Sequence, residues 1–444
     1  MERQVANSGQ SRMCLPVIAL LASLLALAAA PALALADGKP DLSFGKKGTS
    51  AFDPDPLSLQ SPSDMVTDSK GRIVMGGTTF NGPGGNMAWF TRLNRNGSVD
   101  STFGTGGFTT FPVPAQTYIA TVAVDSEGRI VAAGNYDLPM NRDIWVLRLK
   151  SDGHLDSGFG IGGGVGFDFG SFDLGYAAVV GKDGLIYVAA STGDGDSDKA
   201  TVLRYTSDGD PDSTWGTGGA VRLEVGGTSS RAEAIRLDRR GRVVLGGERV
   251  NPDDSSDFLA IRLTRKGALD KTFNGRGFRT IRFMKGQRAE VSDMRVDGKG
   301  RILLLGAGDI APDGLPDGLL ARLTPNGKPD KSFGLSGKVV KSIFGTRMYL
   351  AHVRIDRAGR IVTAGYGRDP RNAEQALLIR FESNGRSDRS WGRNGVRKLT
   401  FGQPEGEGTA MTIDGKGRYL VGGYVFDTGL SYVTRLLVKY PRHR

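Results

Sequence analysis

Three short sequence patterns recur seven times along this 444-residue chain, about 58 residues apart. The first is D-x-x-aromatic-Gly, the second is a turn of the type D-x-x-G-R-I-V, and the third is a short apolar run that ends in arginine. A fixed period of this length requires a repeat architecture, in which one structural unit is copied and packed against its own copies.

Each repeat predicts four short strands separated by tight turns. No run of ten or more residues carries apolar side chains at helical spacing with capping residues at its ends. Glycine, with 66 residues, is present at about twice its usual share, as many tight turns require. Seven four-stranded units indicate a β-propeller, and a solenoid or an array of sandwiches is the competing architecture.

The two ends of the repeat region favour a closed ring. The segment 37–53 supplies only a fourth strand, whereas the last repeat, at 431–444, stops after its third strand. If the first segment completes the last unit, no sheet edge is left open, whereas a linear solenoid would need polar caps. The sequence therefore predicts an all-β, seven-bladed β-propeller over 37–444, with four antiparallel strands per blade and closure by the N-terminal strand.

Residues 1–36 have the composition of a secretory signal peptide. Arg3 and Arg12 precede an uncharged apolar stretch that ends in Ala-Leu-Ala before Asp37. The stretch is also long enough for an uncleaved membrane anchor, but its small-residue ending favours cleavage. The one cysteine, Cys14, would leave with the peptide. We therefore expect a protein without disulfides that is exported to the periplasm, secreted or held at the cell surface, with no membrane span after processing.

The combination of the three patterns resembles the delta-60 repeat family, whose uncharacterised repeats are assigned to β-propellers. The resemblance covers residues 37–440 and rests on GRIV, on the apolar run with arginine, and on D-x-x-F-G. It implies a propeller in exported or surface proteins, and no activity or catalytic residue. One repeat departs from the pattern: Gly181 replaces the turn aspartate and Leu185 the arginine, so that Asp183 is expected to shift the turn by one residue.

The arginine of each apolar run is expected to be buried and paired. In six repeats an aspartate follows the arginine by eight residues, and ring closure would bring Asp41 to Arg435. We expect two parallel hydrogen bonds in each pair, and a cost of about 3 to 5 kcal/mol for losing one partner. A catalytic role is disfavoured because active sites are not normally repeated seven times. The expected structural pairs are Arg92–Asp100, Arg148–Asp156, Arg204–Asp212, Arg262–Asp270, Arg322–Asp330, Arg380–Asp388 and Arg435–Asp41.

The aromatic residue three positions after each aspartate is expected to be a wedge between blades. The glycine that follows it is replaced once, by Asn274, and asparagine tolerates a left-handed backbone best among non-glycine residues. The glycines are therefore interpreted as turn residues, not as a phosphate-binding loop. The seven aromatic residues are Phe44, Phe103, Phe159, Trp215, Phe273, Phe333 and Trp391.

The two faces of the predicted ring differ in how much their turns vary. The turns between first and second and between third and fourth strands lie on one face, here called the uniform face. The second-to-third connections and the links between blades lie on the other, the variable-loop face, where we expect any ligand to bind. The candidate ligand-binding residues there are Phe80, Tyr136, Asp137, Asp194, Asp196, Asp253, Asp254, Asp309, Asp313, Phe426 and Asp427.

Two charged regions leave alternatives open. Asp194, Asp196 and Asp198 have the D-x-D-x-D spacing of a calcium loop, but Lys199 stands where its glycine belongs and no glutamate closes it. The uniform face could hold an anionic polymer or a membrane surface, although solvated turns explain its charge equally well. Its basic residues are Lys70, Arg72, Arg129, Arg239, Arg240, Arg242, Lys299, Arg301, Arg357, Arg360, Lys416 and Arg418.

Together these features favour a binding or scaffold module over an enzyme. No histidine is placed for a serine triad, and the sequence contains no H-E-x-x-H zinc motif. Aspartate-rich loops keep a glycosidase or lyase as the alternative, because paired carboxylates can act as acid and base on sugars. We expect a monomer that recognises envelope polysaccharide or a protein through the variable-loop face, without a cofactor, a metal ion or nucleic acid.

Overall fold

The computed structural model describes residues 37–440, except 57, 81–85, 113–116, 139–140, 171, 194–196, 311–314, 344–346, 369–372, 402–404 and 426–427. The described ranges contain 28 β-strands and no helix, and hence none that could span a membrane. The predicted signal peptide lies outside them. The prediction of an all-β fold is confirmed.

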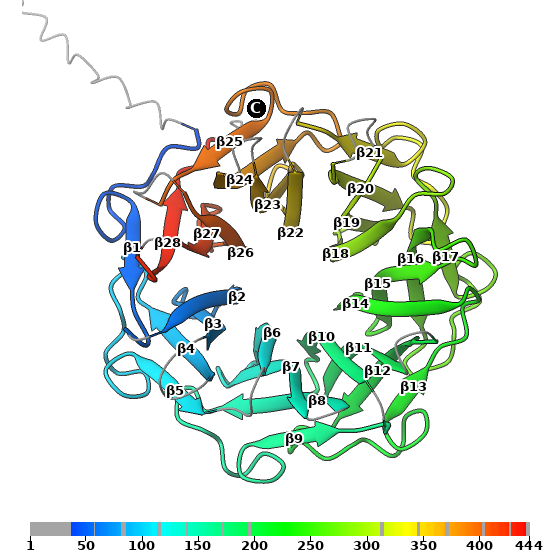
Figure 1. The fold of residues 1–444 in the computed structure, drawn as a ribbon, viewed down its shortest axis with the longest axis horizontal. Helices are drawn as coiled ribbons and strands as arrows, with labels where there is room; N and C mark the ends of the chain where they lie inside the picture. The colour runs from blue at the N-terminus through cyan, green and yellow to red at the C-terminus, as the bar shows by residue number, and fades with distance from the viewer. Residues whose placement is uncertain are drawn as a thin grey trace, which may run out of the picture. The chain divides into compact units, whose positions relative to one another are not determined.

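The strands form seven antiparallel blades of four strands, arranged in a ring (Figure 1). The innermost strands are β2 (Leu59–Thr67), β6 (Tyr118–Val124), β10 (Phe172–Val180), β14 (Ser229–Leu237), β18 (Ala289–Val296), β22 (Arg347–Ile355) and β26 (Glu407–Ile413). The second strands are β3 (Ile73–Phe80), β7 (Ile130–Leu138), β11 (Ile186–Gly193), β15 (Val243–Val250), β19 (Ile302–Gly308), β23 (Ile361–Arg368) and β27 (Tyr419–Tyr424).

Two further strands complete each blade on its outer side. The third strands are β4 (Met87–Leu93), β8 (Asn141–Leu149), β12 (Lys199–Tyr205), β16 (Ser256–Leu263), β20 (Asp317–Leu323), β24 (Glu374–Phe381) and β28 (Ser431–Leu436). The outermost strands are β5 (Phe108–Pro112), β9 (Gly164–Phe167), β13 (Ala220–Arg222), β17 (Phe278–Ile281), β21 (Lys338–Lys341), β25 (Val396–Leu399) and β1 (Thr49–Phe52). One parallel contact between β8 and β10, Phe172 opposite Arg142, joins two neighbouring blades.

The ring closes through the strand that the sequence predicts. The last blade has the order β1-β28-β27-β26, with Thr49 opposite Thr434 and Phe52 opposite Ser431. The N–H of Asp41 also donates to the carbonyl of Arg435 at 2.8 Å. The first and last described segments therefore share one sheet, in which β1 covers the edge that β28 would otherwise leave open.

The hydrophobic core lies between the blades. Seven clusters of buried side chains each combine residues from two neighbouring blades. Along β16, for example, every residue is buried. A strand covered on both faces has a continuous apolar sequence instead of an alternating one, which explains the short apolar runs of the repeats.

The arginine near the end of each third strand connects its blade to the next. Arg92 donates from Nε to Asp100 Oδ2 at 2.7 Å, from Nη2 to the Thr102 hydroxyl at 3.4 Å, and from Nη1 to the carbonyl of Ser151 in the following blade. All seven arginine–aspartate pairs have a nitrogen–oxygen distance of 2.7 or 2.8 Å. The expectation of two parallel hydrogen bonds is wrong for these pairs, because the guanidinium shares its donors among three kinds of acceptor.

Arg380 is the exception to this arrangement. Its Nη1 and Nη2 donate to Asp37 Oδ1 and Oδ2, at 3.1 and 2.7 Å, while its Nε donates to Asp388 at 2.7 Å. Asp37 Oδ1 also accepts the N–H of Lys439 at 3.0 Å. A side chain at the start of the described chain therefore replaces the carbonyl that a neighbouring turn provides elsewhere.

The aromatic wedges lie beneath these arginines. All seven rings are at most 1% exposed, and each lies 4.2 to 5.2 Å from the guanidinium carbon of its own blade. Phe273 also packs against Gly327 of the next blade, where an added Cβ would lie 2.9 Å from the ring. Asn274 has a φ of +51°, so the left-handed conformation predicted for this position is confirmed.

The divergent turn at Gly181 keeps the geometry of the other repeats. Its N–H donates to Leu185 O at 2.8 Å, as Asp68 N–H donates to Arg72 O at 3.0 Å in the first blade. The expected one-residue shift is therefore wrong. The main-chain hydrogen bonds define this turn, and the missing aspartate–arginine pair does not change it.

Candidate functional site

Every innermost strand contains a β-bulge at the same place. In β18 the pairing with β19 shifts between Val291 and Asp293, which leaves Ser292 as an extra residue. A bulge changes the direction of neighbouring side chains and is common beside functional sites. The extra residues of the seven strands are Ser63, Ala120, Tyr176, Glu233, Ser292, Ala351 and Thr409.

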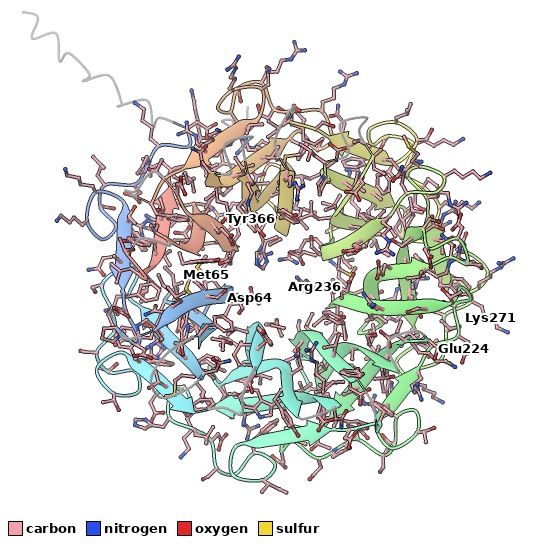
Figure 2. The ribbon with its side chains drawn as sticks, viewed as in Figure 1. Asp64, Met65, Glu224, Arg236, Lys271 and Tyr366 are labelled. Carbon is pink, nitrogen blue, oxygen red and sulfur yellow. The ribbon has the colours of Figure 1, made fainter. Side chains whose placement is uncertain are left out.

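A cavity of about 430 Å³ lies in the central channel beside these bulges. All seven innermost strands contribute to its lining, and Figure 2 shows Asp64 and Arg236 beside the central opening. Its lining contains several charged side chains. The ionisable residues that line it are Asp64, Tyr176, Glu233, Arg236, Asp293, Arg295, His352 and Arg354.

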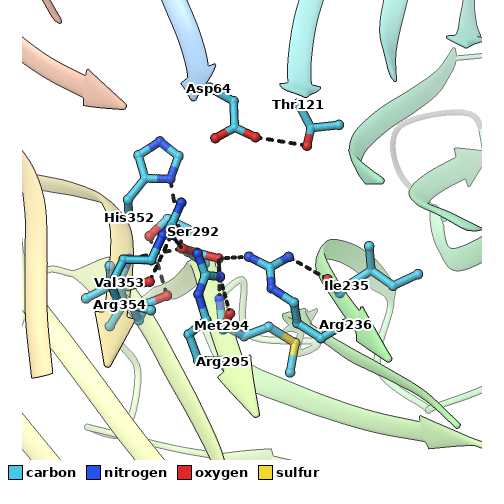
Figure 3. A network of polar contacts seen from close by, with 12 residues as sticks. Asp64, Thr121, Ile235, Arg236, Ser292, Met294, Arg295, His352, Val353 and Arg354 are labelled. Atoms are coloured by element: carbon cyan, nitrogen blue, oxygen red, sulfur yellow. Dashed lines mark hydrogen bonds and ion pairs between the residues drawn. The ribbon is translucent and has the colours of Figure 1, made fainter. Parts of the chain in front are cut away.

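Three arginines in this cavity share one carboxylate. Asp293 accepts from Arg236 Nη2 at 2.8 Å, from Arg295 Nη1 at 2.7 Å and from Arg354 Nη1 at 3.0 Å. Figure 3 shows the three side chains approaching one another from β14, β18 and β22. His352 Nδ1 lies 3.9 Å from the same carboxylate. Burial raises the pKa of Asp293, although the charges of Arg236 and His352 act in the opposite direction.

The three arginines occupy equivalent positions, each the third residue after its bulge. The Nη1 of each arginine also donates to the main-chain carbonyl of the residue before it, which orients the guanidinium group. Their side chains keep 14 to 28% exposure. Since one carboxylate cannot neutralise three guanidinium groups, this side of the channel has an excess of positive charge.

Two further carboxylates line the channel, namely Asp64 on the wall opposite the arginines and Glu233 on β14, the strand of Arg236 (Figure 2). Asp64 on β2 follows its bulge as Asp293 does, and it accepts from the Thr121 hydroxyl at 3.2 Å and from Val122 N–H at 3.1 Å (Figure 3). Glu233 lies three residues before Arg236, and its Oε2 has no hydrogen-bond partner within the described ranges. Burial, followed by the charges of neighbouring carboxylates, raises the pKa of Glu233 well above its usual value.

Exposed aromatic side chains lie at one mouth of the channel. Tyr118 and Phe172 begin β6 and β10, Tyr349 is the third residue of β22, and the three side chains are 41%, 48% and 38% exposed. Phe80 packs against Tyr118 with ring centroids 5.7 Å apart, and Tyr366 stacks on Tyr349 at 5.1 Å. The innermost strands all start on the variable-loop face, so this is the mouth on that face. Exposed apolar groups gathered around an opening mark an interaction site.

Five predicted ligand-binding residues have described side chains, namely Phe80, Tyr136, Asp253, Asp254 and Asp309, and none of these five lines the channel cavity. Phe80 joins the aromatic mouth, and Asp253 accepts from the Ser255 hydroxyl at 2.5 Å. The structure places Asp137 in β7 by its backbone. Outside the described residues lie Asp194, Asp196, Asp313, Phe426 and Asp427.

Sequence reasoning missed the three channel arginines. They recur at a spacing of 59 residues, as Arg236, Arg295 and Arg354, in only three of the seven repeats. That spacing within otherwise divergent innermost strands was the one signal that could have found them. Asp194 and Asp196 of the loop with calcium-like spacing lie outside the described residues, and Asp198 Oδ2 lies 3.5 Å from Arg231 Nε.

The uniform face is less basic than its composition suggests. Arg72 Nε donates to Asp68 Oδ2 in its own turn at 2.7 Å, and Arg72 Nη1 lies 3.5 Å from Asp100. Half of the predicted basic residues are paired within their own turns in this way, which lowers the charge available to an anionic surface. The other five are Arg129, Arg242, Arg301, Arg360 and Arg418.

The ring and its channel define the protein as a β-propeller with a charged central channel. Residues 241–273 and 300–333 match a family described as "Domain of unknown function (DUF5122) beta-propeller". No curated protein matches the sequence.

Several solved structures are similar to this chain at low identity. The polysaccharide lyase Uly1 matches with a TM-score of 0.51 and 12% identity, over 91% of this chain and 97% of the lyase. A protein of unknown function from Dyadobacter fermentans gives 0.44 and 12%, over 88% and 98%. Sqt1 from Chaetomium thermophilum gives 0.47 and 10%, over 87% and 98%. These similarities concern the fold alone.

Proposed function

We propose that this protein is an exported binding propeller for an acidic polysaccharide, with an anionic group of the ligand held in the central channel. The observation that carries the proposal is the convergence of Arg236, Arg295 and Arg354 on the single carboxylate of Asp293. A second anion would be attracted to this site, because the cluster has more positive than negative charge.

The arginines retain donors for such a ligand. A guanidinium group has five N–H donors in a planar fork, whereas Arg236 uses its two Nη atoms on Ile235 O and Asp293. This geometry suits the two oxygens of a carboxylate, a sulfate or a phosphate. The cavity of about 430 Å³ is large enough for a sugar ring with its acidic group.

The aromatic side chains at the mouth favour an acidic sugar over an anion that carries no sugar. Tyr118, Phe172 and Tyr349 are partly exposed around the channel on the variable-loop face, and the apolar C–H face of a sugar packs well on aromatic rings. A polysaccharide would therefore contact aromatic side chains at the mouth while its acidic groups interact with the channel. If a protein binds at this mouth instead, neither oligogalacturonate nor dextran should bind in the experiment below.

Binding of oligogalacturonate, an acidic sugar polymer, tests the proposal by isothermal titration calorimetry, with neutral dextran as the matched polymer. We expect oligogalacturonate to bind and dextran to bind far more weakly. Arg295→Gln should weaken binding about tenfold, which corresponds to the loss of one charge-assisted hydrogen bond. The affinity should fall as salt is added.

The control is Arg239→Gln, which removes an exposed arginine from the uniform face and should leave the affinity unchanged. Arg295→Lys keeps the charge but not the fork, so it should bind with intermediate affinity. Equal binding of both polymers, or normal binding by folded Arg295→Gln, would refute the proposed channel site.

A carbohydrate-active enzyme is the second candidate. It is favoured by the raised pKa of Glu233, which suits a general acid, and by Asp64 as a second carboxylate in the same lining. Acid polysaccharides incubated with the protein would then give new reducing ends, and Glu233→Gln would abolish them. Binding without any product supports the binding module.

A further inference from the structure

Three aspartates meet where the blade of β6–β9 joins the blade of β10–β13. Asp143 lies on β8, Asp168 directly follows β9, and Asp173 lies on β10. One carboxylate oxygen from each lies within 4.8 Å of one from each of the others. This group lies outside the channel cavity and shares none of its lining residues. Carboxylates this close repel one another when they are ionised, and a bound cation would relieve the repulsion.

Comparison of equivalent positions in three blades shows that this cluster is unusual. Ile144 on β8 lies opposite Phe167 on β9, so the next residue pair in the same register is Asp143 opposite Asp168. The same step beyond β16 and β17 places Asp257 opposite Arg282, and these two side chains form an ion pair at 2.9 Å. Beyond β12 and β13, Lys199 forms an ion pair with Glu224. Opposite charges therefore face each other in those two blades. In the blade of β6–β9 two carboxyl groups face each other instead, and like charges across a strand pair destabilise a sheet.

Asp173 gives independent evidence for a bound cation. Its side chain is 0% exposed, and its Oδ1 is buried and has no hydrogen-bond partner among the residues that the structure describes. Its Oδ2 accepts the N–H of Phe169 at 2.7 Å. A buried carboxylate oxygen without a donor is costly, and a metal ion would satisfy it.

We propose that Asp143, Asp168 and Asp173 bind one calcium ion. The donors are all carboxylate oxygens, which hard cations prefer, and the group contains no histidine or cysteine for a softer metal. Calcium accepts irregular oxygen geometry, whereas magnesium needs a near-octahedral set. Asn141 Nδ2 donates to Asp143 Oδ1 at 2.9 Å and would orient this ligand from behind.

The position of the site indicates its role. Asp168 and Asp173 flank the short link between the two blades, and Asp143 lies in the first of them, beside the parallel contact of Phe172 with Arg142. A calcium ion would join the blades at this link, as ion pairs do elsewhere in the ring. The site would then stabilise one side of the variable-loop face, and it does not depend on the proposed polysaccharide binding.

Calorimetry with calcium alone tests the site. The purified protein is treated with EGTA, dialysed and titrated with CaCl₂, and its melting temperature is measured with and without calcium. We expect one ion per chain, a dissociation constant on the order of 10⁻⁴ M or below, and a higher melting temperature with calcium. Asp168→Asn, at an exposed ligand, should weaken calcium binding at least tenfold.

Two matched variants make the result specific. Asp168→Arg copies the pairing of Asp257 with Arg282, so it should bind no calcium, and in EGTA it should melt at a higher temperature than the unaltered protein. Asp309→Asn changes another exposed aspartate outside the cluster and should leave calcium binding unchanged. The proposal fails if the unaltered protein takes up no calcium, or if Asp168→Asn binds it with the same affinity.

Discussion

At the scale of single residues, one arginine serves three purposes in each blade. Arg322 donates to Asp330 at 2.8 Å and to the carbonyl of Ser383 in the next blade, and it lies 4.5 Å above the ring of Phe333. A lysine could not do all three, because it lacks the planar fork. The recurrence of arginine, aspartate and an aromatic residue in every repeat therefore follows from one packing arrangement.

Asp330→Asn tests the energetic weight of one such pair. The substitution leaves the buried Arg322 without its counter-charge, so we expect the free energy of unfolding to fall by about 3 to 5 kcal/mol. Urea unfolding followed by fluorescence measures this loss. Asp208→Asn, in an exposed turn, serves as the control and should change stability by less than about 0.5 kcal/mol. Equal effects of the two variants would contradict the assigned role of the pair.

Gly327→Ala tests the fit of the aromatic wedge. The residue has a φ of +81°, and a new Cβ would lie 2.9 Å from the ring of Phe273. Gly162 has a φ of +64° with no atom within 4 Å of such a Cβ, so Gly162→Ala measures the backbone cost alone. We expect Gly327→Ala to cost about 1 to 3 kcal/mol more than Gly162→Ala in thermal unfolding. Equal costs would show that the wedge does not need the glycine.

At the scale of strands, the sequence predicted the blade but not the channel. The turn patterns and apolar runs indicate second, third and fourth strands, because these have the same surroundings in every blade. The innermost strands face the channel, and their side chains are free to diverge. The bulge at Ser292 changes which side chains point inward, and no residue type specifies it. The convergence of Arg236, Arg295 and Arg354 was therefore visible only in three dimensions.

The calcium cluster escaped sequence analysis for a related reason. Asp143, Asp168 and Asp173 come from two blades and have no regular spacing. Ring closure, in contrast, could be predicted, because an incomplete first unit and an incomplete last unit complement each other. The contact of Asp37 with Arg380 could not be predicted from this pattern. The carboxylate of Asp37 replaces a main-chain carbonyl of the other blades, and no repeated residue type marks that position.

Asp37→Ala tests that contribution to closure. The substitution removes two hydrogen bonds to the buried Arg380 and one from Lys439, so we expect a loss of about 1 to 3 kcal/mol. Hydrogen exchange should accelerate in β1 and β28 more than in β16, on the far side of the ring (Figure 1). Uniform acceleration in all blades would contradict a local role in closure.

At the scale of the whole molecule, the paired aspartates and Glu233 affect the free energy of unfolding with opposite dependence on pH. In the repeated arginine–aspartate pairs burial raises the pKa of the aspartate, but hydroxyl and arginine partners outweigh it, so that the pKa values of six aspartates lie below 3.8. Their stabilisation is present above that value and is lost as the pH falls through the folded-state pKa. The six residues are Asp41, Asp100, Asp212, Asp270, Asp330 and Asp388.

Glu233 has the opposite sign. Burial and the charges of Glu248 and Glu290 raise its pKa well above 4.5, so its contribution to stability is complete below that value and is lost as the pH rises through the folded-state pKa. Glu233→Gln removes this loss, because a neutral amide does not ionise. We therefore expect the free energy of unfolding of Glu233→Gln, relative to that of the unaltered protein, to be higher at pH 8 than at pH 4. Urea unfolding of both proteins at the two pH values measures this change. A stability difference that is independent of pH would show that Glu233 ionises as freely in the channel as in the unfolded chain.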